Sequence, residues 1–413
     1  MGPRARGARE RAPLPAGFAA IWSCVALDLV GFGIVLPLLP IYSERFGATA
    51  TTIGLLVAAY SLAQAVASPL LGRLADRIGR KPVLLISLAG TAVGSLLTGL
   101  AGGLVLLFVG RIIDGLSGGS VSVAQAAVVD VASPDERPRL LGLLGAAFGV
   151  GFVVGPALGG LGALVSPRLP FFIAAAVAGV NAVSAVRRLP ETHRRDGVRP
   201  PDRTVGGARS GRATSVWRDR RVVSLVGVAF VALVAFSMFE ATFALFGQQE
   251  LHLRLASTAG VFTFVGVLIV IVQVRLVKPV TQRFGEAGAV RVGLLTNAVG
   301  LLLLAGLAVV HSWAVAVPAL VVLTVGQGLV VPTLASALAG HVEPGRRGEV
   351  LGAQQSAGAL ARVVGPVAGG LTFEHLAYSA PLLIGGALMT LAAVTLSTRR
   401  SPRSGPTHVP TTT

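Results

Sequence analysis

The sequence predicts an all-α membrane protein in which twelve transmembrane helices form two pseudo-symmetric six-helix bundles. Three observations lead to this fold class. First, 53% of the 413 residues are hydrophobic and only 13% are charged, a composition outside the range of soluble globular domains. Second, the apolar residues gather in about twelve runs, each long enough to cross a bilayer as a helix. Third, the sequence repeats itself across a polar break near its middle.

Each predicted span follows one apolar run. The first run is too long to be the core of a signal peptide, so we expect it to remain in the protein as a span. The spans are expected near 17–42, 51–72, 82–101, 104–131, 139–164, 168–188, 222–247, 256–278, 287–310, 312–339, 349–373 and 378–397.

The polar break supplies the domain boundaries. Residues 190–221 are rich in Arg, Gly, Pro, Asp and Thr and hold almost no large apolar side chain, which indicates a flexible linker. It separates an N-terminal bundle, 17–189, from a C-terminal bundle, 222–397. The tails 1–16 and 398–413 complete the division.

The distribution of Lys and Arg predicts the orientation in the membrane. Cations gather at the N-terminus, in alternate connections and in the C-terminal tail, and they are few in the other connections. The positive-inside rule therefore puts both termini in the cytoplasm of a multi-pass protein of the cell membrane, with anionic lipid as a partner of the basic loops. The net charge of +17 does not indicate nucleic-acid binding, because no aromatic stacking residues lie among the cations.

The internal repeat has a fixed offset of 210 residues. Pro134, Arg137, Leu141, Gly142, Gly155, Pro156, Gly159 and Gly160 recur as Pro344, Arg347, Leu351, Gly352, Gly365, Pro366, Gly369 and Gly370. A weaker echo of Asp76–Gly79 occurs at Gln282–Gly285. Since the offset covers an even number of spans, the halves are parallel repeats about an axis along the membrane normal, which is typical of secondary transporters.

Charged residues inside the spans are the candidate functional groups. Each costs about 2.5–3.5 kcal/mol at a helix centre, so each is expected to face a cavity or a partner. Asp28 lies roughly 16 Å into the first span at 1.5 Å per residue. Arg111 and Asp114 are three residues apart on the fourth span and so share one face. Glu240 lies in the outer part of the seventh span and Arg362 deep in the eleventh.

A dense charged island, Gly72–Pro82, joins the second and third spans, and we expect it to be a short loop. It contains Gly72, Asp76, Arg77, Gly79 and Arg80 in the order Gly, three residues, Asp, Arg, any residue, Gly, Arg, Lys. Three further motifs follow the chain. They are Asp28-x-x-Gly31-x-Gly33-x-x-x-Pro37-x-x-Pro40, Gly110-Arg111-x-x-Asp114-Gly115-x-x-Gly118-Gly119 and Gly151-x-x-x-Gly155-Pro156-x-x-Gly159-Gly160.

With these four motifs in this order, the chain resembles the major facilitator superfamily, and within it the twelve-span drug/proton antiporters, especially the tetracycline exporters. The resemblance implies that Asp76 reaches the N-terminus of the eleventh-span helix and that Arg80 pairs with Asp130. Both contacts are expected only when the cytoplasmic side is closed, so these residues would form a gate. The alternative is that the island's cations only set topology and attract anionic lipid.

The resemblance also associates the fifth-span motif, Gly151, Gly155, Pro156, Gly159 and Gly160, with antiport as opposed to symport. Its glycines, three and four residues apart, predict a groove along one helix face into which a neighbouring helix can pack. The alternative interpretation, that these small residues only allow helices to pack, is partly the same, because close packing is how such a helix would seal.

The expected function is proton-coupled efflux of an amphipathic small molecule by alternating access. Asp28 is the leading proton or cationic-substrate site, and Arg111 would modulate its affinity for protons. Asp114, which replaces the Gln common in the family, either has such a role or only pairs with Arg111. Glu240 could attract cationic drugs, whereas Arg362 has no assigned partner.

The predicted cavity includes aromatic side chains, with lipid-facing or packing roles as the alternative. Phe32, Phe236, Phe239 and Phe243 are its expected members. No ATP, cofactor or metal is expected, because the chain lacks a phosphate-loop motif, its six His residues are scattered and Cys24 is alone. A monomer would suffice. The rival functions are a proton-coupled uptake symporter and a membrane enzyme, and the latter lacks a nucleophile elbow or a Cys/His pair.

Overall fold

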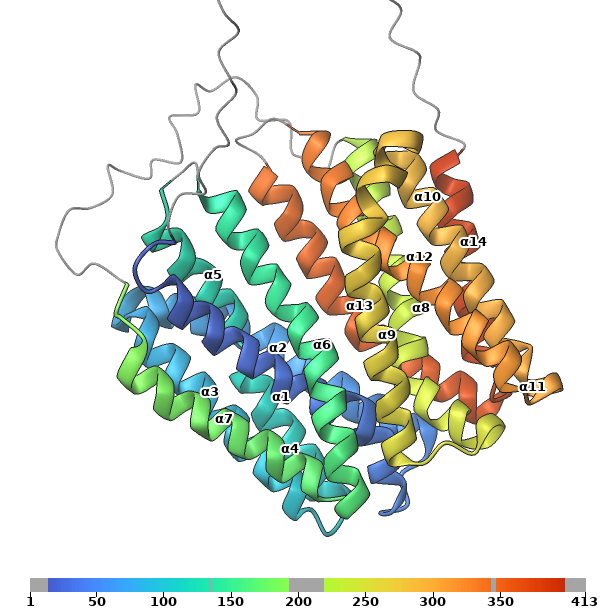
Figure 1. Cartoon of the computed structure of the whole chain (residues 1–413), viewed down its shortest axis with the longest axis horizontal. Helices are drawn as coiled ribbons and strands as arrows, with labels where there is room; N and C mark the ends of the chain where they lie inside the picture. The colour runs from blue at the N-terminus through green and yellow to red at the C-terminus, as the bar shows by residue number, and fades with distance from the viewer. Residues whose placement is uncertain (1–13, 134–135, 193–218, 343–346, 398–413) are drawn as a thin grey trace, which may run out of the picture.

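The computed structural model describes residues 14–133, 136–192, 219–342 and 347–397, which form fourteen helices (Figure 1). The N-terminal half contains α1 (Phe18–Glu44), α2 (Ala50–Ile78), α3 (Arg80–Leu100), α4 (Leu104–Ser117), α5 (Ser120–Val131), α6 (Arg137–Val165) and α7 (Leu169–Arg188). The C-terminal half contains α8 (Arg220–Leu251), α9 (Leu255–Arg275), α10 (Val277–Ala305), α11 (Leu307–Val310), α12 (Trp313–Gly340), α13 (Arg347–His375) and α14 (Ala380–Ser397). Most of the predicted linker and both tails lie outside the described residues.

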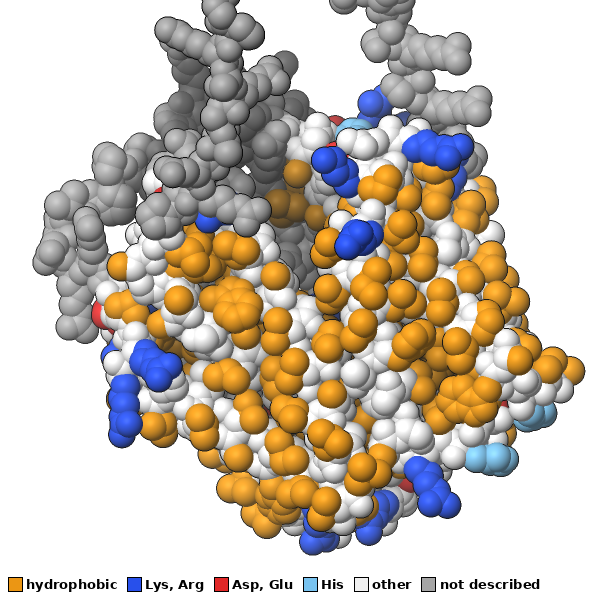
Figure 2. Space-filling view, viewed as in Figure 1, with side chains coloured by type: hydrophobic (Ala, Val, Ile, Leu, Met, Phe, Trp, Pro, Cys, Tyr) orange, Lys and Arg blue, Asp and Glu red, His pale blue; other side chains and the backbone are white. Residues whose placement is uncertain are grey.

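Helices occupy every one of the predicted spans, with α4 and α5 sharing the fourth and α10 and α11 the ninth. Among the described residues, ten helical stretches are long and apolar enough to cross a membrane. Of the other two, α14 is apolar but shorter, and α13 is less apolar because it carries two arginines and two glutamates. Apolar side chains cover the middle of the face seen in Figure 2, and most Lys and Arg side chains lie toward its ends.

The charged island is not the loop that we expected. Helix α2 continues through Gly72 and Asp76 to Ile78, and α3 begins at Arg80, so Gly79 alone separates them. Gly79 has φ 107°, a conformation that glycine adopts without steric cost. The loop prediction was wrong because the apolar run ends before the helix does. Its last two turns carry the charges, and one glycine is enough to turn the chain.

The internal repeat is confirmed in three dimensions. Helices α6 and α13 are both 29 residues long, and their bounds differ by 210 at each end. The weak echo of the island is also real, because α10 bends at Gly285 (φ 70°) where the first half turns at Gly79. One difference breaks the symmetry: the fourth span is split at Gly118–Gly119 into α4 and α5, whereas α12 is continuous.

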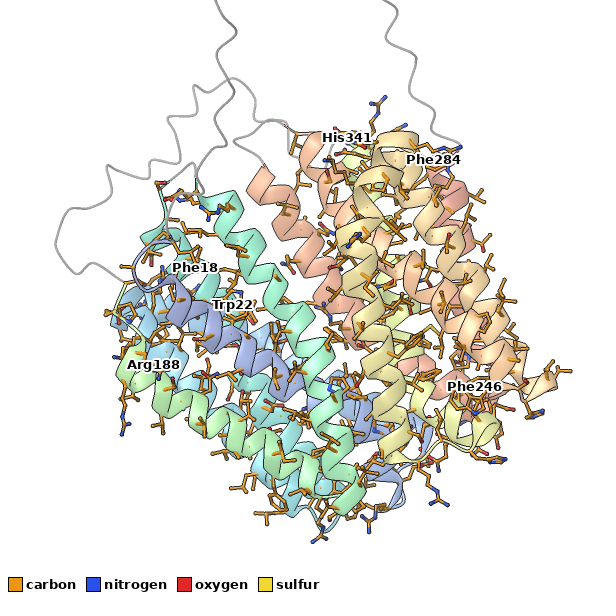
Figure 3. All side chains as sticks on the ribbon, in the orientation of Figure 1. Phe18, Trp22, Arg188, Phe246, Phe284 and His341 are labelled. Atoms are coloured by element: carbon orange, nitrogen blue, oxygen red, sulfur yellow. The ribbon has the colours of Figure 1, made fainter. Side chains whose placement is uncertain are left out.

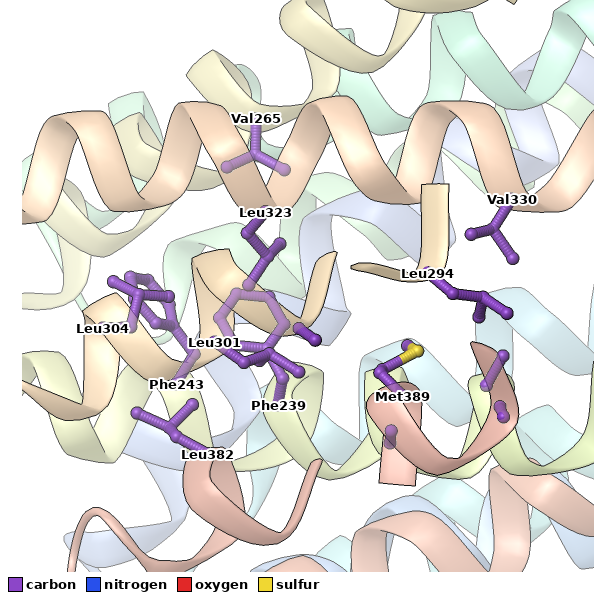
Figure 4. Packing of buried hydrophobic residues seen from close by; sticks show 14 of the residues in the cluster. Phe239, Phe243, Val265, Leu294, Leu301, Leu304, Leu323, Val330, Leu382 and Met389 are labelled. Atoms are coloured by element: carbon purple, nitrogen blue, oxygen red, sulfur yellow. The ribbon is translucent and has the colours of Figure 1, made fainter. Parts of the chain in front are cut away.

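Glycines bring α6 close to α1, as the fifth-span motif predicted. A Cβ at Gly155 would lie 2.7 Å from the Cα of Gly33, and one at Gly151 would lie 2.7 Å from the backbone of Leu29. The second copy of the motif brings α13 equally close to α8, because a Cβ at Gly365 would lie 2.7 Å from the side chain of Ser237 on α8. In the C-terminal bundle, α8, α10, α12 and α14 add a buried apolar core (Figure 4).

A Gly155→Ala substitution is expected to destabilise the N-terminal bundle by about 1–3 kcal/mol, because the added methyl group meets backbone that cannot move aside. Gly145→Ala, on the same helix, is the matched control, since a Cβ there meets nothing within 4 Å. Thermal unfolding of the purified proteins in detergent measures the difference. Equal unfolding temperatures for the two variants would contradict the close contact.

We call the end of the molecule at which α1 begins and α14 ends the terminal end, and the opposite end the distal end. Phe18 and His341 lie toward the terminal end and Phe246 toward the distal end (Figure 3). The bundles meet mainly along two helix pairs, α2 with α13 and α6 with α9.

The two bundles are in contact distally and separate toward the terminal end. Along α6, a Cβ at Gly160 would lie 2.9 Å from Ala259 and one at Gly149 would lie 3.0 Å from Val270, both on α9. Further along the same helix, Gly145 and Gly142 have no such neighbour within 4 Å. The space between the bundles is therefore open toward the terminal end.

Candidate functional site

The carboxylate of Asp28 lies where the fourth span is broken. Ser120, the first residue of α5, donates a hydrogen bond of 2.5 Å from its Oγ to Asp28 Oδ2. The break at Gly118–Gly119 creates this contact, because it starts a new helix beside the middle of α1. Asp28 is partly exposed, whereas Ser120 is buried. The sequence identified Asp28 but gave no sign of Ser120 as its partner.

Arg111 and Asp114 form an ion pair on α4, with 2.7 Å between Nη1 and Oδ2. The alternative in which Asp114 pairs with Arg111 is therefore present in the structure. The side chain of Arg111 is only 2% exposed. Its guanidinium also lies 4.2 Å above the ring of Tyr60, in cation–π contact. Arg111 thus contacts Asp114 and Tyr60, whereas Asp28 accepts its hydrogen bond from Ser120. Asp114 is nevertheless near enough to act electrostatically on Asp28.

Gln64 and Tyr60 on α2 complete the N-terminal part of the site, and sequence reasoning missed both. Gln64 Nε2 donates to the carbonyl oxygen of Gly118 (3.0 Å), which the helix break leaves free, and to the hydroxyl of Tyr60 (3.2 Å). Their signal was available. Two large polar side chains four residues apart in a mainly apolar span share one helix face, which indicates a polar surface inside the protein.

Glu240 lines a pocket between α6, α8 and α9. Its other walls are mainly aromatic: Phe152, Phe236, Phe239, Val261, Phe243, Phe262, Val265 and Ile269. The predicted members Phe236, Phe239 and Phe243 are therefore present, although Phe239 and Phe243 are also buried in the C-terminal core (Figure 4). Phe32 is not among these residues, and its ring lies 5.7 Å from that of Tyr60.

Arg362 on α13 links the two charged groups of the site. It is exposed and is near enough to act electrostatically on Glu240 of its own bundle and on Tyr60 of the other. Glu240 is the carboxylate on which Arg362 acts in this way, and no ion pair between the two is formed among the described residues. The site then contains one set of charges from each bundle, with Arg362 between them.

The predicted partner of Arg80 is present. Arg80 Nε lies 2.9 Å from Asp130 Oδ2, and its Nη1 lies 2.7 Å from Asp76 Oδ1. The expectation that the pair with Asp130 forms only on closure is wrong, because both residues belong to the N-terminal bundle and pair here while the terminal end is open. Asp76 is 63% exposed.

Glu191 stabilises the turn of the island, a role that the sequence did not reveal. Its carboxylate accepts hydrogen bonds from the backbone N–H groups of Arg80 (2.9 Å) and Lys81 (3.2 Å), at the start of α3. The same carboxylate fills the space that a Cβ at Gly79 would need. A Cβ at Gly72, by contrast, would meet nothing within 4 Å, and the side chain of Arg77 is exposed.

The family model of the Major Facilitator Superfamily matches residues 21–366 and 276–412. Relatives include the tetracycline resistance protein, class C, of Escherichia coli, 31% identical over 356 residues that cover 84% of this chain and 87% of the relative. Another is the multidrug resistance protein 1 of Bacillus subtilis, 29% identical over 353 residues, with coverage of 84% and 86%.

Solved structures share the fold. The human organic anion transporter MFSD10 (TETRAN) superposes with a TM-score of 0.67 at 25% identity, covering 92% of this chain and 98% of that one. A bacterial homolog of the human lysosomal transporter Spinster, in an inward-facing and occupied conformation, gives a TM-score of 0.68 at 16% identity, covering 92% and 94%. The second likeness shows the fold alone.

Proposed function

The chain belongs to the major facilitator superfamily, and from this membership we propose that it exports an amphipathic drug across the cell membrane in exchange for protons. Relatives named for tetracycline and multidrug resistance, about 30% identical over most of the chain, support drug efflux. The observation that carries the proposal is that both bundles hold charges within their spans, the Arg111–Asp114 pair beside Asp28 in one and Glu240 with Arg362 in the other. We propose a monomeric transporter with no enzymatic step.

The charge pattern supports a cytoplasmic terminal end, so the opening between the bundles would admit substrate from the cytoplasm. Asp28 would take up a proton from the outside in the opposite, outward-open state and release it in the state described above. Alternating access then exchanges proton entry for drug exit. In this proposal the close packing of Gly151 and Gly155 against α1 is the seal of the antiport motif, and the exposed carboxylate of Asp76 belongs to a gate at the terminal end.

Everted membrane vesicles test this function. In them, a proton gradient that is acidic inside should drive the accumulation of a fluorescent drug, and an uncoupler should abolish it. A proton-coupled uptake symporter, the alternative function, would instead carry its substrate out of these vesicles. Accumulation that persists without a gradient would rule out antiport.

We further propose that Glu240 and its aromatic neighbours select cationic drugs. The carboxylate offers a counter-charge, and the aromatic faces attract cations and flat apolar groups. Glu240→Gln is expected to reduce export of a cationic drug about tenfold, equivalent to about 1.4 kcal/mol, while export of a neutral drug changes little.

Drug export from cells expressing each variant measures the selectivity, with Glu250→Gln as the control. Glu250 is also on α8, but its Oε2 pairs with His311 at 2.8 Å, away from the pocket. Equal losses for cationic and neutral drugs would mean that Glu240 does not recognise charge.

A further inference from the structure

The carboxylate of Glu374, on α13, connects the two bundles at the distal end. Its Oε2 accepts a hydrogen bond of 2.9 Å from the backbone N–H of Thr51, the second residue of α2. First-turn N–H groups have no partner within their own helix, and a helix N-terminus carries partial positive charge. Thr49 caps α2 through Thr52, so its side chain does not satisfy the N–H of Thr51. Glu374 supplies that acceptor from the opposite bundle.

This contact mirrors the one that the family resemblance implies for Asp76. Helices α2 and α13 are antiparallel neighbours, since Ala50 is close to Gly370 and Gly54 is close to Pro366. Glu374 lies near the C-terminal end of α13 and caps the start of α2. Asp76 lies near the C-terminal end of α2, beside which α13 starts at the terminal end. One carboxylate at each end of the same helix pair can therefore cap the other helix.

The helix pair is in close contact at the distal end and open at the terminal end. At the distal end, the backbones of α2 and α13 touch at Gly54 and Gly370, which leaves no room for a Cβ at either glycine. At the terminal end, a Cβ at Gly72 or at Gly352 would meet nothing within 4 Å, and Asp76 pairs only within its own bundle in the contacts described above. When two bundles rock against each other as rigid bodies, closing one end of such a helix pair separates the other end.

We propose that Glu374 is the distal latch of the transport cycle, holding the outer end shut until Asp76 engages α13 at the terminal end. The proposal rests on alternating access and adds a residue to it. The latch is a charge-assisted hydrogen bond between the bundles, which is stronger than a neutral one. Release of Glu374 and engagement of Asp76 would then be two halves of one rocking motion.

Labelling of a single cysteine tests the latch. The reporter is Ile53→Cys in a Cys24→Ser background, because Cys24 is the single cysteine of the chain and Ile53 is 1% exposed and packed against the C-terminal core. A membrane-impermeant maleimide is applied to the outside of intact cells. Glu374→Gln, which keeps the shape but removes the charge, is expected to raise the labelling rate about fivefold.

Two controls define the result. Glu250→Gln removes a carboxylate at the same end that pairs within one bundle, and it should leave the labelling rate unchanged. Asp76→Asn weakens the opposite cap, and it should lower the rate. Glu374→Asp is the second variant, for use if Glu374→Gln does not fold. It keeps the charge on a side chain that is shorter by one methylene group, and it should also raise the labelling rate.

An unchanged rate in the Glu374 variant that folds would overturn the latch, as would an equal rise in Glu250→Gln. The labelling needs neither drug nor proton gradient. A failure of the proposed drug export would therefore leave this result standing, and the two proposals can fail separately.

Discussion

An Asp28→Asn variant is expected to lose gradient-driven drug accumulation, with the rate falling at least about tenfold, equivalent to about 1.4 kcal/mol. The amide keeps the shape of the side chain and can still accept the hydrogen bond from Ser120, so the helix contacts should survive. It cannot bind and release a proton in the transport cycle. Everted vesicles given an acidic interior measure the rate, and the amount of folded protein is checked by gel filtration in detergent.

Ser120→Ala is the matched control for this experiment, because it removes the hydrogen bond while leaving a carboxyl group that titrates. We expect that variant to retain gradient-driven transport with a shifted dependence on pH. Undiminished accumulation in Asp28→Asn would assign proton coupling to another carboxylate of the site, with Asp114 and Glu240 as the candidates.

Replacement of Arg111 by Met is expected to destabilise the protein by about 3–5 kcal/mol, the usual cost of removing one partner of a buried ion pair. The guanidinium lies 2.7 Å from Asp114 and over the ring of Tyr60, and its loss leaves the carboxylate of Asp114 without its cation. The shift in thermal unfolding in detergent measures the effect.

The double variant Arg111→Met with Asp114→Asn is the control, because it removes both charges at once. A buried pair replaced by neutral groups often costs little, so most of the lost stability should return. If the single and double variants unfold at the same temperature, the two charges do not depend on each other.

Much of the fold was predictable because its signal is long and redundant. Each span rests on some twenty apolar residues, and the repeat constrains both halves with one offset. The exceptions are local. Helix α2 runs through the island to Ile78, and the fourth span breaks at Gly118, because a helix continues or stops according to backbone conformations that apolar runs do not encode.

The site shows the same contrast. Charges stand out in an apolar sequence, so Asp28, Glu240 and Arg362 could be identified at once, and neighbours on one helix such as Arg111 and Asp114 could be paired by spacing. Partners from distant parts of the chain could be identified only where the family resemblance implied them, as for Arg80 and Asp130. Ser120 is an ordinary small polar residue, and the acceptor of its hydrogen bond is fixed only by how α5 packs against α1.

The split of the fourth span makes the two bundles chemically unequal. Within the described residues, its break places a helix start beside Asp28, and the positive end of α5 is a permanent counter-charge that needs no mobile side chain. Glu240 has no such helix start in α12, which is continuous, and depends on Arg362. The carboxylate of Asp28 thus lies at a fixed helix start with a hydrogen bond from Ser120, whereas that of Glu240 lies near a movable side chain. This division of labour suits a transporter in which one half handles protons and the other adapts to drugs of different shape.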